Sequence, residues 1–177
     1  MAGRSDSTGL RPQPLQTPSS DSLGAPRPWW TGDRGEWWVV AQLVLLALAL
    51  VLPPAGALPD GLRILAFPLA LAGGTLIGLG AAALGSSLTI LPRPPARGQF
   101  VRRGIYRVLR HPIYAGVILL VLAWACWRTS LLHAGLAFAI AAFFGAKARR
   151  EEQWLLERFP AYAAYRRAVG AFVPRIR

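Results

Sequence analysis

The residues best suited to chemistry gather in two short stretches of the chain. The first, YRVLRHPIYAG (residues 106–116), brings Tyr106, Arg110, His111 and Tyr114 together. The second, RREE (residues 149–152), places two arginines before two glutamates. Aromatic faces and carboxylates stabilise a bound cation, and an arginine can clamp an acid group with two parallel hydrogen bonds. Both stretches are therefore candidates for a binding or catalytic site.

An apolar hairpin connects the two stretches. Its arms run from about Pro112 to Trp127 and from about Leu131 to Ala146, with only residues 128–130 between them. A turn this short returns the chain to the side from which it came, and packed helices lie about 8–10 Å apart. We therefore predict one pocket at the mouth of the hairpin, formed by the His-Tyr cluster and the glutamate pair. Ionisable groups at such a position are functional candidates.

The same residues also fit roles without chemistry. Glu151 and Glu152 can pair with the preceding arginines on a solvated helix face, and the two tyrosines can be interfacial aromatics. Pro112 can simply occupy the first turn of a helix. Four arginines of the preceding loop fit the role of fixing membrane orientation: Arg93, Arg97, Arg102 and Arg103. Spacing alone does not decide between the structural and the functional interpretation.

The composition indicates a membrane protein. The 177 residues are 54% hydrophobic and 16% charged, whereas soluble domains carry roughly 25% charged residues. The net charge of +12 is concentrated in residues 92–110, with six arginines and no acid, and in residues 147–177, with eight basic residues and three acids. Because these clusters bracket apolar segments, they indicate the cytoplasmic flank of membrane spans and not a nucleic-acid surface. The one cysteine, Cys126, allows neither an intramolecular disulfide nor a cysteine-based metal site, and we expect no metal.

We predict an all-α fold with about four transmembrane helices. Besides the hairpin, apolar segments run from about Trp37 to Leu52 and from about Ile64 to Leu91. The second contains GGTLIG, which puts Gly74 and Gly78 on one face, where small residues let helices pack closely. His133, near the hairpin turn, is expected at the membrane interface without a chemical role. The arginine bias places the loop between the second and third spans, and both termini, in the cytosol.

The two ends of the chain are predicted to differ in kind. Residues 1–28 are rich in Ser, Pro, Gly and Gln, which is typical of a disordered tail and not of a signal peptide. After the fourth span an amphipathic helix is predicted on the membrane or on the bundle, because apolar side chains recur at steps of three and four: Trp154, Leu155, Phe159 and Tyr162. Pro160 predicts a break at Phe159 and a second short helix from about Ala161.

The block GIYRVLRHPIYAG, followed by EEQWLLERFPAYAAYRRAVGAFVP, resembles the isoprenylcysteine carboxyl methyltransferase family. The related phospholipid N-methyltransferases share much of the pattern. The family's elements are an Arg-His-Pro-x-Tyr motif, an apolar hairpin, a Glu-Glu pair, then Phe, Tyr-x-x-Tyr and a late Pro. In this chain they are Arg110 to Tyr114, Glu151-Glu152, Phe159, Tyr162, Tyr165 and Pro174. The family often has Gly after the Phe, where this chain has Pro160.

The resemblance implies a multi-span enzyme that uses S-adenosylmethionine and takes a lipid-like substrate from the bilayer. Residues 29–91 would form the first two helices and residues 92–177 the cofactor-binding region. A basic residue just before the glutamate pair would hold the substrate's acid group, a role for which Lys147, Arg149 and Arg150 compete. By position in the motifs, the residues holding the cofactor would be Gly98, Gln99, Phe100, Val101, Tyr106, Arg110, His111, Pro112, Ile113, Tyr114, Glu151 and Glu152.

The methyl acceptor stays open at this stage. A carboxylate is already ionised at neutral pH, whereas an amine needs a base, and the resemblance assigns His111 and the glutamates to the cofactor. We therefore favour O-methylation of an isoprenylcysteine-like or other lipophilic acid. The alternatives are a phospholipid or amine N-methyltransferase, a sterol-reductase-like enzyme and a lipid-binding protein without catalysis. We expect membrane lipids and a lipophilic or prenylated substrate as partners, but neither nucleic acid nor an obligate protein partner. The Ala-, Arg- and Gly-rich composition indicates a bacterial cytoplasmic membrane.

Overall fold

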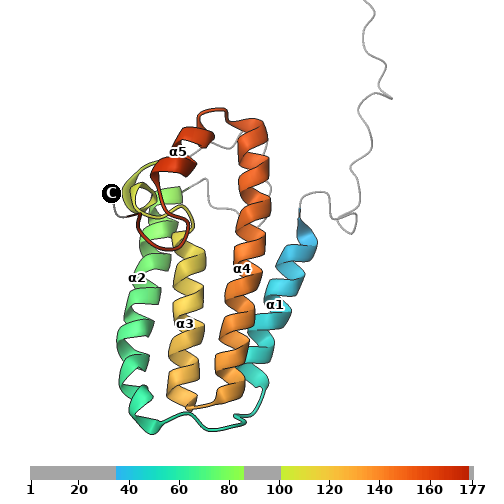
Figure 1. The fold of residues 1–177 in the computed structure, drawn as a ribbon, viewed down its shortest axis with the longest axis vertical. Coiled ribbons are helices and arrows are strands. Elements are labelled where there is room, and N and C mark those ends of the chain that lie inside the picture. The colour runs from blue at the N-terminus through green and yellow to red at the C-terminus, as the bar shows by residue number, and fades with distance from the viewer. Residues whose placement is uncertain (1–34, 86–100, 176–177) are drawn as a thin grey trace, which may run out of the picture. The chain divides into compact units, whose positions relative to one another are not determined.

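The structure, a computed structural model, describes residues 35–85 and 101–175. Within these ranges the chain is helical and contains no β-strand beyond two isolated bridges. Short 3₁₀ helices, Asp60–Leu65 and Gly104–Arg107, precede the second and third long helices. In chain order (Figure 1) the α-helices are α1 Glu36–Val51, α2 Ala66–Leu84, α3 Pro112–Arg128, α4 Leu131–Arg158 and α5 Tyr162–Ala168. The predicted tail at residues 1–28 lies outside the described residues.

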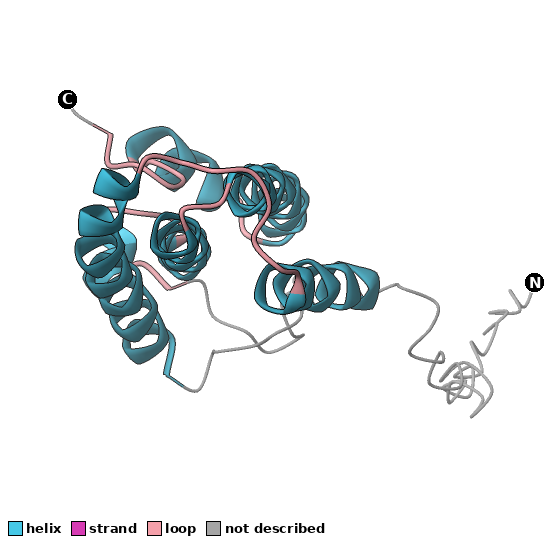
Figure 2. Cartoon of the chain, turned by 90° about the horizontal axis from the view of Figure 1, so that it is seen from below, coloured by secondary structure: helices cyan, strands magenta, loops and turns pink. Residues whose placement is uncertain are grey.

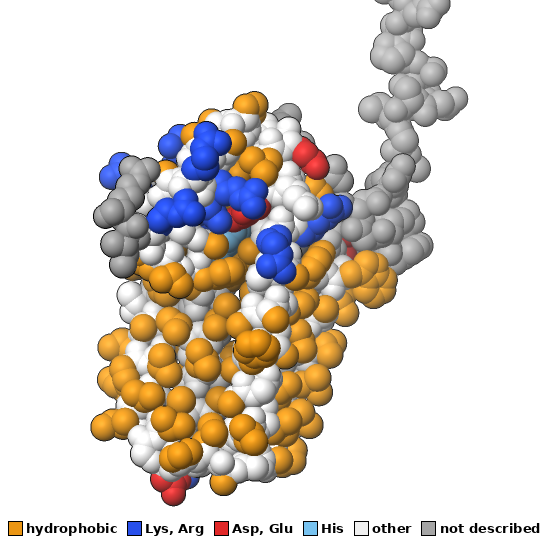
Figure 3. Space-filling view, in the orientation of Figure 1, with side chains coloured by type: hydrophobic (Ala, Val, Ile, Leu, Met, Phe, Trp, Pro, Cys, Tyr) orange, Lys and Arg blue, Asp and Glu red, His pale blue; other side chains and the backbone are white. Residues whose placement is uncertain are grey.

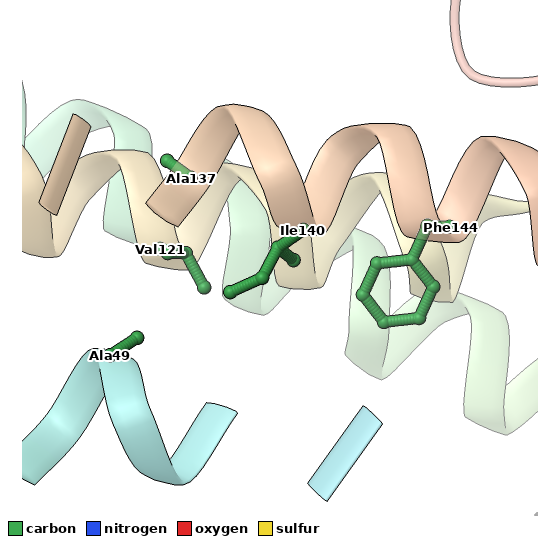
Figure 4. Close-up of a cluster of buried hydrophobic side chains, with 5 residues drawn as sticks. All are labelled: Ala49, Val121, Ala137, Ile140 and Phe144. Atoms are coloured by element: carbon green, nitrogen blue, oxygen red, sulfur yellow. The ribbon is translucent and has the colours of Figure 1, made fainter. Parts of the chain in front are cut away.

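The long helices pack side by side. α2 packs against α3, α3 against α4 and α4 against α1 (Figures 1 and 2), so that α3 and α4 form the predicted hairpin. The core between α1, α3 and α4 is built from small and branched side chains and one ring (Figure 4): Ala49, Val121, Ala137, Ile140 and Phe144. The three α4 residues are spaced by three and four positions, which places them on one face of the helix.

Glycines allow α2 and α3 to approach closely, but they are not the predicted pair. A Cβ atom on Gly73 would lie 2.7 Å from the Gly116 carbonyl oxygen, and one on Gly116 would lie 2.6 Å from that of Gly73. Gly74 and Gly78 face open space, with no described atom of a neighbouring element within 4 Å of such a Cβ. The prediction that Gly74 and Gly78 mediate packing is therefore wrong. One step along a helix turns the side chain by about 100°, and the packed face passes through Gly73 and Gly80.

The turn between α3 and α4 is as short as predicted and is tied to the α1–α2 connection. Thr129 adopts a left-handed conformation with φ 44° and ends α3. The Ser130 hydroxyl caps α4, donates to the Ala55 carbonyl oxygen at 3.0 Å and accepts from the Ala55 N–H at 3.1 Å. The Leu58 N–H also donates to the Thr129 carbonyl oxygen at 2.8 Å. Hydrogen bonds to backbone groups therefore connect the two loops at this end of the bundle, and the polar motifs lie at the other end.

Two helical stretches, Asp60–Leu84 and Leu131–Arg158, are long and apolar enough to cross a membrane. The apolar helices α1 and α3 have 16 and 17 residues. They are thus about 25 Å long, against a hydrocarbon core of about 30 Å. Large apolar side chains remain on the surface, such as Phe67, 77% exposed, and Phe138, 78% exposed. The helical, apolar architecture is as predicted, and the count of four spans stays a prediction.

Helix α4 is longer than the predicted fourth span. It continues without interruption to Arg158, so the predicted amphipathic segment begins as the last turns of the same helix. The intervening AKARR contains only good helix formers. The helix ends before Pro160 and α5 begins at Tyr162, which confirms the predicted break. His133 is 1% exposed and lies inside the bundle, because it shares the inner face of α4 with Ala137; its expected position at the level of the membrane interface stays a prediction.

Candidate functional site

The two polar stretches meet at the end of the hairpin, as predicted. His111 Nε2 lies 3.0 Å from Glu152 Oε1, and the Tyr114 hydroxyl donates to Glu151 Oε2 at 2.9 Å. These contacts join the start of α3 to α4 across 41 and 37 residues of sequence. Figure 3 shows acidic and histidine side chains between basic ones at the end of the bundle that carries α5.

Glu152 has charged or hydrogen-bonding partners at both oxygens. Besides His111, Oε1 lies 2.8 Å from Arg110 Nε, and Oε2 lies 2.9 Å from Arg166 Nε. The side chains of Glu152, His111 and Arg110 are only 5%, 6% and 11% exposed. A carboxylate buried to this degree needs such partners, because an unpaired buried charge costs several kcal/mol. Glu152 thus has little acceptor capacity left and serves to position His111, Arg110 and α5.

Glu151 is more open. Its Oε2 accepts the Tyr114 hydroxyl and lies 3.9 Å from His111 Nδ1, which is too far for a hydrogen bond. Its side chain is 25% exposed. Because a carboxylate offers about four acceptor positions, Glu151 keeps most of them for a ligand. The neighbouring glutamates therefore differ in role. Glu152 connects α4 to the start of α3 and to α5, and Glu151 can accept hydrogen bonds from a ligand.

A short backbone pairing fixes the segment that carries His111. The N–H groups of Arg110 and His111 donate to the carbonyl oxygens of Gly170 and Ala171 at 2.8 and 3.0 Å. Gly170 is required in this loop, because a Cβ atom there would collide with the Val173 carbonyl oxygen. The last described segment of the chain thereby becomes part of the site wall.

Helix α5 is tied to the same wall. The Tyr165 hydroxyl donates to the Tyr106 carbonyl oxygen at 2.5 Å. Arg110 Nη1 donates to the Arg166 and Val169 carbonyl oxygens at 2.5 and 2.8 Å, at the negative end of the helix dipole. Burial raises the pKa of Tyr106, and it raises the pKa of Tyr165 to about 12. Both phenols are therefore neutral hydrogen-bonding groups at physiological pH.

Aromatic rings line the bundle side of the site. The rings of His111 and Tyr114 are stacked with centroids 5.4 Å apart and an interplanar angle of 3°, and the Phe144 ring lies 4.8 Å from that of Tyr114. Lys147 is buried beside them, with Nζ 5.2 Å from the centre of the Tyr114 ring. The same Nζ donates to Gln42 Oε1 of α1 at 2.6 Å. The Tyr114 ring thus lies within reach of a cation, which is the interaction that aromatic sites offer to charged ligands.

Several predicted cofactor residues are not among the side chains that contact the glutamate pair in the structure. Gly98, Gln99 and Phe100 are outside the described residues, and Val101 is half-buried where the described chain resumes. Pro112 is the first residue of α3. Ile113 packs against α2, since its Cγ1 would lie 2.7 Å from a Cβ on Gly80. Pro112 and Ile113 therefore shape the start of the helix, while the side chains that meet the glutamates are those of Arg110, His111 and Tyr114.

The three basic candidates for the substrate's acid group are placed differently. Arg149 and Arg150 are exposed, and Arg150 Nη1 donates to Gln153 Oε1 at 3.1 Å. Lys147 is 2% exposed and lies on the Tyr114 side of α4. In residues 35–85 and 101–175, no group of three His, Cys, Asp or Glu side chains could hold a metal ion.

Sequence reasoning missed four side chains of this site: Gln42, Phe144, Arg166 and Phe172. The Phe172 ring lies 5.8 Å from that of His111, and Arg166 pairs with Glu152. Gln42 carried a usable signal, because it is the one polar residue between Trp37 and Leu52, and isolated polar residues in such segments mark functional positions. Nothing in the sequence separated Arg166 from the neighbouring arginines.

Comparisons with known proteins agree with the motifs. The sequence model of a family described as phospholipid methyltransferase matches residues 62–161, more than half of the chain. The cobalt-zinc-cadmium resistance protein CzcN of Cupriavidus metallidurans is 38% identical over 77 residues, which cover 43% of this chain and 36% of that protein. The chain thus spans little more than a third of this curated relative.

A solved structure shares the fold. The eukaryotic intramembrane Ras methyltransferase ICMT (isoprenylcysteine carboxyl methyltransferase) superposes with a TM-score of 0.60 and 22% identity, over 93% of this chain and 58% of that chain. At this level of identity the likeness shows a common architecture. Together with the family match, it confirms the resemblance that the motifs indicated.

Proposed function

Because the chain belongs to the phospholipid methyltransferase family, we propose that it is a membrane-embedded methyltransferase that uses S-adenosylmethionine. The observation that carries this proposal is the meeting of the two motifs. Glu151 and Glu152 of α4 contact Tyr114 and His111 at the start of α3 at 2.9 and 3.0 Å. A hairpin that served only to span a membrane would not need four buried or half-buried polar side chains matched across its open end.

The donor set fits this cofactor. When bound, S-adenosylmethionine supplies a methyl group carried by a positively charged sulfur atom. Glu151 can accept hydrogen bonds from hydroxyl or amino groups of the ligand, and a carboxylate beside aromatic rings is an environment that stabilises a cation. The His111 ring lies next to both glutamates and forms part of the wall of the site. Arg110 acts through Glu152 as a positioning residue. Residues 98–101 would complete the site, as the family motif implies.

A lipophilic acid is the methyl acceptor we favour. A carboxylate is already ionised at neutral pH and needs no base, whereas an amine substrate must first lose a proton. His111 Nε2 lies 3.0 Å from Glu152 Oε1, so one of its two ring nitrogens is engaged within the protein. Lys147, buried beside Tyr114, is better placed than the exposed Arg149 and Arg150 to attract an acid group near the cofactor. An isoprenylcysteine-like carboxylate has the required chemistry.

N-methylation of a phospholipid amine is the second candidate. The description of the matching family favours it. It requires a group that takes a proton from the amine, and within the site Glu151 is the glutamate that keeps acceptor positions free.

Charge places the site at the cytosolic surface in this proposal. The basic residues of the described segments 101–110 and 147–175 gather on the side of the glutamate pair (Figure 3). The α1–α2 connection at the opposite end carries Arg63 and Asp60, whose side chains pair at 3.5 Å. Positive charge marks the cytosolic side of membrane proteins. With four spans, this orientation puts both termini in the cytosol. The Ala-, Arg- and Gly-rich composition favours a bacterial cytoplasmic membrane.

A methyl-transfer assay tests the proposal. Vesicles containing the purified protein receive S-adenosylmethionine labelled in its methyl group, with either a prenylated cysteine or phosphatidylethanolamine. Mild alkali releases methanol from a methyl ester but leaves a methylated amine intact. Alkali-labile label on the acid supports O-methylation, and alkali-stable label on the amine supports the second candidate. Transfer to neither lipid by a folded protein refutes the proposed function. Exposed Glu157 supplies the control variant Glu157→Gln, which should transfer as the parent does.

A further inference from the structure

A pocket lies on the arginine side of Glu152. It is formed by the last turns of α4, by α5 and by the final described residues, and has a volume of about 420 Å³. Four guanidinium groups and two apolar side chains line it: Arg110, Arg166, Arg167, Arg175, Leu156 and Ala163. Neither Glu151 nor Tyr114 belongs to this lining, whereas Arg110, which contacts Glu152 at 2.8 Å, belongs both to the lining and to the wall of the proposed methyl-donor site.

The pocket holds more positive charge than Glu152 balances. Arg110 and Arg166 pair with Glu152 at 2.8 and 2.9 Å. Among the described residues no carboxylate pairs with Arg167 or Arg175, and Arg175 Nη1 donates instead to the Arg167 carbonyl oxygen. Like charges held this close repel each other, and a bound anion would relieve the repulsion. The arrangement therefore favours an anionic ligand.

We infer that this pocket binds a phosphate group, with the phosphodiester of a phospholipid headgroup as its natural source. Guanidinium groups match phosphate oxygens in pairs, which makes arginine the preferred side chain for this anion. The pocket is larger than a bare anion needs, and its volume lies in the usual range of small-molecule sites. Leu156 and Ala163 add apolar wall for the carbons next to the phosphate. Figure 3 shows the basic side chains where the apolar surface ends, which is the level of lipid phosphates in a membrane.

Thermal unfolding of the detergent-purified protein tests this site without requiring activity. The probes are a short-chain phosphatidylglycerol, inorganic phosphate, and sodium chloride at matched ionic strength. We expect a saturable rise of the melting temperature with the lipid, and no such rise with chloride. In Arg167→Gln and in Arg175→Gln the half-saturating lipid concentration should increase on the order of tenfold, the ratio given by one charge-assisted hydrogen bond of about 1.4 kcal/mol. The matched control is Arg107→Gln, an exposed arginine outside the pocket, which should respond as the parent does.

Each outcome bears on the inference. A response to both lipid and inorganic phosphate supports a site for phosphate as such, and a response to lipid alone supports a headgroup site. An equal response to chloride, or an equal loss in Arg107→Gln, would show that only diffuse positive charge is present and would overturn the inference. Displacement of phosphate by S-adenosylhomocysteine in a competitive manner would assign the pocket to the cofactor and would also overturn it. Because Arg167→Gln should keep its S-adenosylhomocysteine affinity, failure of this site is distinguishable from failure of the proposed function.

Discussion

Replacing Glu152 with glutamine should loosen the end of the bundle that carries α5. The carboxylate contacts Arg110, His111 and Arg166, and glutamine keeps its shape but has one acceptor oxygen and no charge. Arg110 would stay buried, at 11% exposure, without its counter-charge, and His111, at 6% exposure, would lose the carboxylate that it contacts. Breaking a buried pair in this way costs about 3–5 kcal/mol. Arg166 is 48% exposed, so its part of the loss is below about 1 kcal/mol.

Thermal unfolding in detergent measures this loss. The lower value of about 3 kcal/mol lowers Tm by about 6–12 °C for a chain of this size. Glu151→Gln keeps an oxygen for the Tyr114 hydroxyl and should lower Tm by less than about 2 °C. Glu157→Gln, on the exposed side of the same helix, controls for the change of charge. Equal Tm values for Glu152→Gln and Glu157→Gln would refute the reasoning, since the three contacts would then contribute no stability.

Three further expectations concern packing, titration and substrate binding. Gly116→Ala should lower Tm by several degrees, because its methyl group would lie 2.6 Å from the Gly73 carbonyl oxygen. The control Gly78→Ala faces open space and should not lower Tm. Equal effects of the two variants would mean that the packed face of α2 is wrongly assigned. Since the folded-state pKa of Tyr165 lies above the ordinary value of about 10, the neutral phenol stabilises the fold, and this contribution is lost as the pH rises through about 12. Near-ultraviolet titration of the parent against Tyr165→Phe checks this, and a phenol that ionises near its ordinary pH in the folded protein would contradict the burial. Lys147→Met should raise KM for a lipophilic acid at least about tenfold while S-adenosylhomocysteine affinity stays within about threefold; an unchanged KM would remove Lys147 from the acid site.

The sequence was sufficient to predict the hairpin and the meeting of its two polar ends. Two apolar blocks separated by three residues favour a hairpin, and arms of equal length bring the polar stretch before the first arm close to the polar stretch after the second. The break before Pro160 was equally predictable, because the residue before a proline disfavours the helical conformation.

The orientation of each helix about its own axis was not predictable. Nearly every residue of α2 is apolar, so no polar face indicates which side packs inward, and Gly74 was chosen where Gly73 makes the contact. The same difficulty applies to the glutamate pair, since adjacent residues point about 100° apart and either could have faced His111. The contact of Arg166 with Glu152 depends on the path of the chain between α4 and α5, which no residue pattern specifies.

Calorimetric titration of S-adenosylhomocysteine into the purified parent and into Glu151→Gln tests the central claim most directly. We expect saturable binding to the parent and an affinity at least about tenfold lower in the variant, the effect of losing one charge-assisted hydrogen bond. The melting temperature of Glu151→Gln should stay close to that of the parent, and Glu157→Gln should bind as the parent does. A folded parent that binds no S-adenosylhomocysteine, or equal affinities of parent and Glu151→Gln, would contradict the assignment of this site.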